Sequence, residues 1–306
     1  MGGVRNEKKK GVPPSLWKQT YRRLLQHKLT VISLLFLCFM FLLCFIGPSF
    51  SPYITDRTDI SNANQQPGIH HWLGTDQYGR DVLTRLMLAG QISLTVGLAS
   101  MVLSLVIGSL LGAAAGFYRG AADMIIMRIA DMLMSIPGLP LLLILATVMS
   151  EWKVPSEYRM YLIMMMLSLI GWPSLARLVR GQILSLKEQP FMMAAEVLGL
   201  SDKRKILYHL LPNTLPLLLV AATLHVAGAM LSESALSFLG LGVAPPTPSW
   251  GNMMEAANHF MDFTLRPWLW IPPGTAIFLT VVAIHLLGDG LRDAFDPKVK
   301  RQVKMK

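Results

Sequence analysis

Phe191-Met-Met-Ala-Ala-Glu-Val-Leu-Gly199 and His209-Leu-Leu-Pro-Asn213 lie in a charged stretch, residues 177–212, that separates two long apolar segments. Over the whole chain of 306 residues, 53% are hydrophobic, only 15% are charged, and the mean hydropathy is +0.46. These values exceed what the core of a soluble protein requires. Backbone groups that face lipid must be paired within their own segment, so helices are the expected spanning elements. The sequence therefore predicts an all-α, polytopic membrane protein.

Six apolar runs can each cross a hydrocarbon layer about 30 Å thick, which takes roughly 20 helical residues. We predict transmembrane helices at 29–47, 93–117, 124–148, 160–176, 215–239 and 268–287. The third run contains Pro137 and Pro140, so we expect it to be kinked inside the bundle. Arg128 and Asp131 stand three residues apart near its start and are expected to form an ion pair.

The distribution of Lys and Arg predicts the orientation, because cytoplasmic segments retain basic residues. Of the 28 Lys and Arg residues, 22 fall on the side that carries both termini and the 177–212 stretch. This bias also accounts for most of the net charge of +10, and no basic face interleaved with aromatic residues indicates nucleic-acid binding. We expect a cytoplasmic tail, a first transmembrane helix, an extracytoplasmic loop, a core of five transmembrane helices and a second cytoplasmic tail at 1–28, 29–47, 48–88, 89–288 and 289–306.

Local signals within 177–212 predict a short helix, a bend and a second helix. Pro190 suits a first helical turn and Gly199 suits the end of that helix. Ser201 can cap the second helix, which we expect to stop at Pro212. One face of the first helix is apolar with small residues at its centre, and consists of Phe191, Ala194, Ala195 and Leu198. This face fits either a partner protein or the chain's own transmembrane helices.

The same stretch resembles the loop by which ABC-importer permeases engage their ATPases. The family pattern reads Glu-Ala-Ala, three residues, Gly, nine residues, then Ile-x-Leu-Pro, and the Ala-Ala, Gly and Leu-Pro positions are in register here. Met193 replaces the Glu of the pattern, and His209 replaces the Ile. The resemblance implies an ATPase-coupling role for Phe191, Met193, Ala194, Ala195, Glu196, Leu198, Gly199, His209, Leu211 and Pro212.

A second string, His71-Trp-Leu-Gly-Thr-Asp-Gln-Tyr-Gly-Arg-Asp81, is similar to one found in the peptide and nickel branch of these permeases. Further strings at 235–251 and 288–297 agree with that branch. Gly74 and Gly79 permit positive φ and Asp76 can form an Asx turn, which favours a folded cap over the outer mouth. The alternative is direct contact with the substrate-binding protein or the peptide, through Gly74, Asp76, Gly79, Arg80 and Asp81.

Three ionisable residues, Glu233, His225 and His285, fall within the predicted spans, where such side chains face a bundle interior or water. Glu233 stands in Leu231-Ser-Glu-Ser-Ala235, so it is either a hydrogen-bonding node among hydroxyl groups or part of a translocation path. Neither histidine has the spacing of a metal ligand. We therefore expect both to be buried and hydrogen-bonded.

The resemblance implies a type I ABC-importer permease with six transmembrane helices, placed in a bacterial cytoplasmic membrane with both termini in the cytoplasm. Its implied partners are a second homologous permease, two cytosolic ABC ATPases, an extracytoplasmic peptide-binding protein and the lipid bilayer. Its implied substrates are oligopeptides, and dipeptides or nickel are the alternatives within the branch.

Several motifs of catalysis are missing from the chain. It contains no Gly-x4-Gly-Lys-Ser/Thr phosphate loop, no metal-ligand cluster and no Gly-x-Ser-x-Gly string. We therefore expect no enzyme activity and no cofactor on this chain, with ATP and Mg bound by the partner ATPases. Two rival classes are an ion-coupled secondary transporter, which the proline kinks would fit, and a membrane scaffold that transports nothing.

Overall fold

A computed structural model describes residues 24–54 and 57–295, so most of the two predicted tails lies outside the described residues. Five of its helices are long and apolar enough to cross a membrane. They are α2 (Lys28–Phe45), α3 (Val82–Tyr118), α6 (Ser156–Lys187), α9 (Leu211–Phe238) and α12 (Ile271–Phe295). Two shorter helices, α4 (Gly120–Ser135) and α5 (Gly138–Glu151), form a sixth span if the bent pair counts as one. The prediction of an all-α, polytopic membrane protein is confirmed.

The expected kink in the third span is a break of 85° between α4 and α5. Ile136 and Pro137 have ψ angles of 128° and 126°, which take the backbone out of the helix. A residue that precedes proline is biased away from helical geometry, so the chain bends at Ile136. Pro140 lies in the first turn of α5, where its missing N–H leaves no helical bond unmade.

The expected ion pair between Arg128 and Asp131 is wrong. Asp131 instead accepts a hydrogen bond from Arg177 of α6. One helical turn away, Arg180 of α6 binds both carboxylate oxygens of Asp123, with nitrogen to oxygen distances of 2.5 and 2.6 Å. Both acidic residues of α4 therefore bind arginines of another helix, and the two ion pairs hold α4 along α6.

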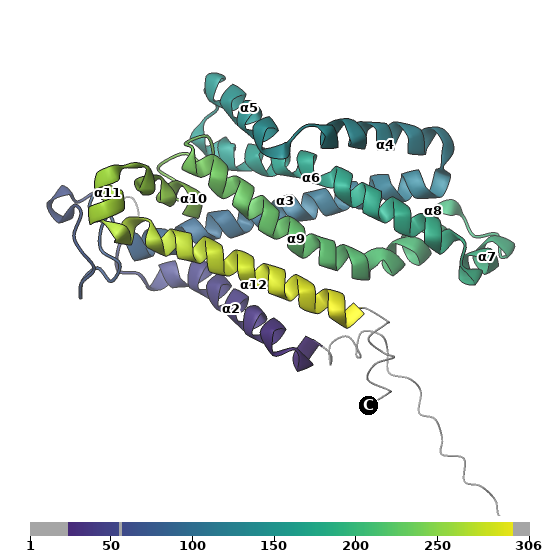
Figure 1. The fold of residues 1–306 in the computed structure, drawn as a ribbon, viewed down its shortest axis with the longest axis horizontal. Coiled ribbons are helices and arrows are strands. Elements are labelled where there is room, and N and C mark those ends of the chain that lie inside the picture. The colour runs from purple at the N-terminus through teal and green to yellow at the C-terminus, as the bar shows by residue number, and fades with distance from the viewer. Residues whose placement is uncertain (1–23, 55–56, 296–306) are drawn as a thin grey trace, which may run out of the picture.

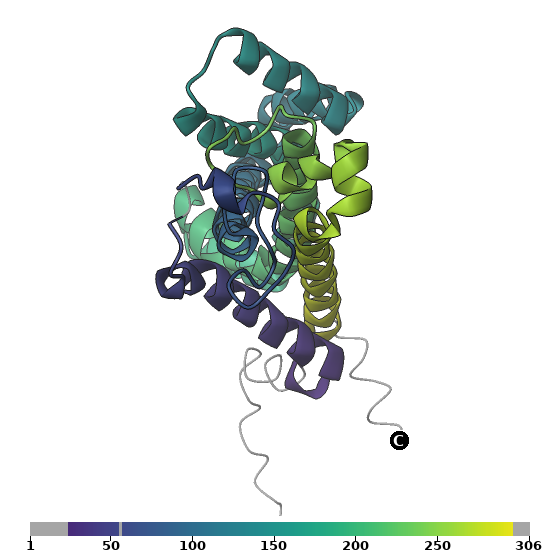
Figure 2. The ribbon, with the colours of Figure 1, turned by 90° about the vertical axis from the view of Figure 1, so that its left-hand side faces the viewer.

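The helices form a bundle in which α3 is central and contacts α2, α4, α6 and α9 (Figures 1 and 2). α12 lies between α2 and α9 and contacts both of them. α3 approaches α6 closely because Gly108, Gly112 and Gly116 face that helix at intervals of four residues. A Cβ on Gly112 would lie 2.4 Å from the carbonyl oxygen of Ala176, so a larger residue would force these two helices apart.

Short elements gather at the two ends of the bundle (Figure 1). At one end, which we call the α7 end, are α7 (Pro190–Val197), α8 (Asp202–Arg204) and η3 (Lys205–Leu210). At the opposite end, the α11 end, are η1 (Gly47–Phe50), η2 (Ile60–Asn62), α10 (Trp250–Met253), η4 (Met254–Asn258), α11 (Phe260–Leu265) and η5 (Pro267–Leu269). α2 begins and α12 ends on the side of the bundle that faces away from the α11 end.

Three predicted helix boundaries are wrong because helices continue into the expected loops or tail. α3 begins at Val82, well before the predicted start at residue 93, and α6 runs through the charged segment 177–187. α12 continues to Phe295, past the predicted end at residue 287. Pro212 does not end a helix either, since it occupies the first turn of α9 and the helical path runs from Asp202 to Phe238. η3, which immediately precedes α9, is a π-helix. Its wider turn allows the helix to pass a residue that has no N–H.

Candidate functional site

The local structure of the 177–212 stretch follows the predicted order of helix, bend and helix. Pro190 occupies the first turn of α7, and Gly199 ends that helix with φ of +68°. The N–H of Gly199 donates to Glu196 O at 2.9 Å and that of Leu200 to Ala195 O at 3.1 Å, which satisfies carbonyls at the helix end. Ser201 is at the cap position of α8, although its side chain makes no capping hydrogen bond.

The predicted apolar face of α7 does not act as one surface. Met192 is fully buried and packs in a cluster with Val179, Ile183 and Leu210, and Ala195 is almost fully buried as well. Phe191, Ala194 and Leu198 are exposed. The buried side of α7 packs against the chain's own helices, as one interpretation predicted. The other side is exposed and fits the alternative, contact with a partner protein.

Sequence reasoning missed the placement of two residues on α7. Met192 anchors the helix, and Val197, next to Leu198, is its most exposed apolar side chain. Val197 and Leu198 are 88% and 76% exposed. The helix is apolar on most of its circumference, so periodicity alone gives no signal for which stripe is buried.

The remaining predicted coupling residues lie around this exposed surface. Met193 and Glu196 of α7 are exposed, as is Pro212 at the start of α9. His209 and Leu211 are half-buried, and the carbonyl of His209 accepts a hydrogen bond from Asn213 Nδ2 at 2.6 Å. The structure thus gathers both halves of the predicted motif at the α7 end. We call the exposed apolar residues Phe191, Met193, Ala194, Val197 and Leu198 the α7 surface.

Two lysines tie this end to the central helix. Lys187 Nζ, at the end of α6, donates to Phe117 O at 2.9 Å and lies 4.7 Å from the centroid of the Phe117 ring. Lys205 Nζ, in η3, lies 5.9 Å from the centroid of the same ring. Because Phe117 belongs to the last turn of α3, the ends of α3, α6 and η3 meet at one aromatic side chain.

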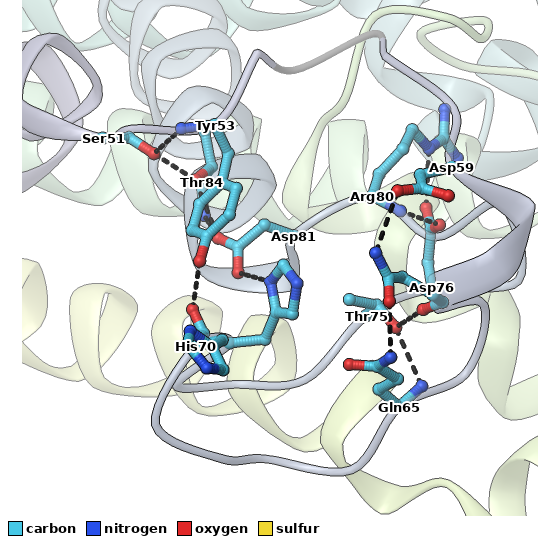
Figure 3. Close-up of polar contacts among 12 residues, drawn as sticks. Ser51, Tyr53, Asp59, Gln65, His70, Thr75, Asp76, Arg80, Asp81 and Thr84 are labelled. Atoms are coloured by element: carbon cyan, nitrogen blue, oxygen red, sulfur yellow. Dashed lines mark hydrogen bonds and ion pairs between the residues drawn. The ribbon is translucent and has the colours of Figure 1, made fainter.

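At the α11 end, Asp76 organises the turn in the second predicted string (Figure 3). Its carboxylate accepts hydrogen bonds from the backbone N–H groups of Tyr78 and Arg80, at 2.9 and 3.0 Å, and from Arg80 Nε at 2.7 Å. Arg85 Nε lies 3.7 Å from the same carboxylate. The predicted Asx turn is present, and Arg80 is held inside the loop rather than extended away from it.

Asp81 forms a second polar centre in the same loop and begins α3 (Figure 3). It caps the helix by accepting hydrogen bonds from the N–H and hydroxyl groups of Thr84 at 2.8 and 2.7 Å. Its other oxygen lies 2.9 Å from His71 Nδ1. Asp81 is buried, so its carboxylate is used within the chain.

Gly74 and Gly79 are required by space as well as by backbone conformation. Their φ angles are +72° and +73°. A Cβ on Gly79 would lie 1.8 Å from Asp59 O, and one on Gly74 would lie 2.5 Å from Gln65 O. Both glycines therefore allow two backbone segments of the loop to pass close to each other, as the cap interpretation requires. Trp72, Gln77 and Tyr78 are the exposed members of the string.

Glu233 is fully buried among hydroxyl groups. Its carboxylate accepts hydrogen bonds from Ser93 Oγ of α3 at 3.0 Å, from Ser237 Oγ at 2.7 Å and from Ser234 Oγ at 3.5 Å. Ser93 Oγ also accepts the N–H of Trp250 at 3.2 Å. Glu233 thus joins α3, α9 and α10, which matches the first of its two interpretations, a structural hydrogen-bonding node.

The two histidines of the spans differ from each other. His225 of α9 is half-buried, and its Nε2 lies 3.1 Å from Ser174 Oγ of α6, as expected. The prediction for His285 is wrong, because this residue is exposed on α12. Its neighbours Ala283 and Ile284 face inward instead, so the helix turns His285 outward.

Comparisons with known proteins agree with this architecture. Residues 108–301 match the model of the family described as the inner membrane component of binding-protein-dependent transport systems, and residues 15–67 match the N-terminal transmembrane domain of oligopeptide transport permease C. An oligopeptide transport system permease protein of Bacillus subtilis is 37% identical over 94% of this chain and 91% of its own length.

Two further relatives are similarly close. A putative peptide permease protein of Brucella suis is 40% identical over 91% of this chain and 90% of its own length. A glutathione transport system permease protein of Pectobacterium atrosepticum is 36% identical over 93% of this chain and 92% of its own length. The transmembrane helices, the α7 surface and these matches lead to one conclusion: this chain belongs to the family of inner membrane components of binding-protein-dependent transport systems.

Proposed function

We propose that this chain is one of two permease subunits of an ATP-driven importer that takes up oligopeptides. Relatives named as oligopeptide and peptide permeases match more than nine-tenths of the chain and support this substrate class. Relatives named as dipeptide and glutathione permeases match over a similar length, so a shorter peptide is the alternative substrate. The family favours this function over an ion-coupled secondary transporter or a scaffold.

The proposed partners are a second permease, two cytosolic ABC ATPases and an extracytoplasmic peptide-binding protein. ATP and Mg would be bound by the ATPases, so this chain would have no catalytic site and no cofactor of its own. The α7 end would face the cytoplasm, together with both termini, and the α11 end would face the binding protein. The excess of Lys and Arg on the side of the 177–212 stretch supports this orientation.

The α7 surface is the observation that carries the proposal. Val197 and Leu198 stay exposed while Met192 and Ala195 attach the same helix to the bundle. An apolar surface on a firmly attached helix suits insertion into a groove of an ATPase. When the two ATPases close on ATP, contacts that differ between their open and closed states would bias the permeases toward outward opening. Phe117, with Lys187 and Lys205, provides a rigid connection from this surface to α3.

Uptake by cells tests the substrate class. Cells that lack only this gene should lose uptake of labelled tetrapeptide and pentapeptide, and the intact chain should restore it. Loss of dipeptide or nickel uptake alone would assign the chain to a sister system. No loss of any substrate would contradict the transport function itself.

Gly199 offers a matched pair of variants for the coupling role. Its φ of +68° is difficult for Val, whereas Asn adopts this conformation readily. A Cβ at this position meets no atom within 4 Å, so the two variants differ through backbone conformation rather than through a clash. We expect Gly199→Val to insert normally in the membrane but to lose most peptide uptake, and Gly199→Asn to retain it. Full uptake by a well-expressed Gly199→Val variant would contradict the coupling role of this bend.

A further inference from the structure

A groove of about 370 Å³ opens between α3, α5, α6 and α9, at the middle of the bundle. Ser100, at its wall, is the midpoint of α3. Four serines and three glycines contribute to the lining, and His225 is its one ionisable residue. Polar side chains at membrane depth are costly in contact with lipid, so such a lining suits a surface that meets water or a polar ligand.

Ser100 and the start of α5 place hydrogen-bond donors without an acceptor at the groove. Ser100 is 1% exposed, and its Oγ has no hydrogen-bond partner among the described residues. α5 begins in the groove at Gly138, and Pro137 at its cap position provides no side-chain acceptor. The N–H groups of Gly138 and Leu139 belong to the first turn, so they cannot bond within their own helix. The start of α5 therefore presents free donors and a partial positive charge.

His225 adds a third element on the opposite wall. Its Nε2 is engaged with Ser174 Oγ at 3.1 Å, which leaves Nδ1 for another partner. In the part of the chain that the structure describes, no Asp or Glu lines the groove. Donors from α3 and α5 thus border a space that offers little negative charge, and a ligand with negatively charged oxygen atoms would satisfy them.

A peptide carries one such group whatever its sequence, namely its C-terminal carboxylate. We propose that this groove binds the C-terminal carboxylate of the transported peptide, with the N–H groups of Gly138 and Leu139 and the hydroxyl of Ser100 as donors. This proposal rests on the proposed function. The glycine and serine lining leaves room for a main chain and offers no pocket of fixed charge for a side chain, so the site recognises peptides independently of their sequence.

The test compares a tetrapeptide that has a free C-terminal carboxylate with the same peptide as a C-terminal amide. Both are supplied to the complete importer, reconstituted with its ATPases and binding protein. The concentrations are set to saturate the binding protein, whose affinity for each peptide is measured separately. The ratio of acid to amide uptake is then compared between permease variants, because the unchanged binding protein contributes equally to each variant.

Gly138→Pro removes one donor at the first helical position, where proline is compatible with the helix. We expect its acid-to-amide ratio to fall by about tenfold, because a hydrogen bond to a charged group is lost. Gly138→Ala is the control, since it retains the N–H. Its Cβ would lie 3.5 Å from Ile170 Cγ2, an ordinary contact, so the ratio should not change.

Ser100→Ala separates a binding role from a structural one. It deletes a buried hydroxyl that has no partner among the described residues, so the variant should be at least as stable as the wild type. Its ratio of acid to amide uptake should nevertheless fall. Ser109→Ala is the control on the same helix. The Ser109 hydroxyl is also buried without a partner among the described residues and lies outside the groove, so its loss should leave the ratio unchanged.

The possible outcomes distinguish a failure of the carboxylate site from a failure of the proposed transport function. An unchanged ratio in both Gly138→Pro and Ser100→Ala, with transport of both peptides by the wild type, would overturn the carboxylate site and leave the proposed function intact. Equal uptake of the acid and the amide peptide by the wild-type importer would also overturn the carboxylate site. If the wild-type complex transported neither peptide, the proposed function would fail, and the site with it.

Discussion

The loop before α3 and the 177–212 stretch both carry family signatures, but the structure uses them in opposite ways. In the loop before α3, Gly74, Gly79 and Asp81 are buried, and the polar groups bind one another. In the 177–212 stretch, α7 buries Met192 and leaves Val197 and Leu198 exposed. The first signature forms an internal fold, whereas the second leaves an apolar surface that none of the residues described by the structure covers.

The physical reason for this difference lies in the chemistry of the side chains. Asp76 and Asp81 can satisfy their hydrogen-bonding capacity with nearby N–H groups, so a polar string is able to close on itself. Apolar side chains on a short helix gain stability only when another surface removes them from water. A sequence signature therefore indicates a shared structure or function, but the structure decides whether its residues are available to a partner.

The largest effect is expected at Gly79, inside the loop before α3. Gly79→Ala places a Cβ 1.8 Å from Asp59 O at a φ of +73°, so the loop cannot close as it does here. We expect a loss of more than about 4 kcal/mol in the free energy of unfolding, measured by thermal unfolding in detergent. Gly68→Ala is the control, because its Cβ meets only Gln66 O at 3.8 Å. Equal stability of the two variants would contradict the internal role of this signature.

Substitutions on the α7 surface should impair partner binding without lowering the stability of the chain. Val197→Asp and Leu198→Asp change side chains that are 88% and 76% exposed, so the chain should keep its stability. A charge in a closely packed apolar interface is costly, and we expect co-purification of the ATPases and peptide uptake to be abolished. Ile54→Asp, at an exposed apolar residue of the α11 end, should retain both. ATPase binding by both α7 variants at the wild-type level would show that the surface serves another purpose.

Two adjacent methionines on α7 separate attachment from docking. Met192 is fully buried, so Met192→Ala should lower the free energy of unfolding by about 2–4 kcal/mol through the cavity it leaves. Met193 is 58% exposed, and Met193→Ala should change stability by less than about 0.5 kcal/mol. Thermal unfolding of the two variants side by side measures the difference. A smaller loss for Met192→Ala than for Met193→Ala would reverse the assigned faces of the helix.

The smallest effect is expected where the 177–212 stretch meets α3. Lys187→Met removes a hydrogen bond to Phe117 O and a cation placed 4.7 Å from its ring centroid. We expect a stability loss of about 1 kcal/mol. Lys203→Met, at an exposed lysine of α8, should have no measurable effect. If peptide uptake per ATP hydrolysed also fell for Lys187→Met alone, the contact would be part of the coupling route.

Much of the local structure at the α7 end could be predicted because single residues decide it. Pro190 suits only the first turn of a helix, and Gly199 is the residue that adopts positive φ most easily. The same holds for Asp76, whose side chain binds its own neighbours. These signals depend on a few consecutive residues, so no tertiary contact was needed to interpret them.

Predictions failed where distant segments compete for the same residue. Asp131 has Arg128 three positions before it, yet Arg177 approaches from α6 and binds it. Pro212 would end an isolated helix, but the π-helical turn of η3 and packing of α9 within the bundle carry the helix through it. His285 lies in an apolar run, and only the packing of α12 against α2 and α9 turned it outward.

The sequence by itself determined that the chain is helical and crosses a membrane, because the length and apolarity of a run set its transfer free energy whatever its neighbours are. The tertiary structure decided which side of α7 is free, how Glu233 is satisfied, and that Ser100, Gly138 and His225 line one groove. These features depend on side chains that lie far apart in the sequence, and no local pattern records which of them will meet.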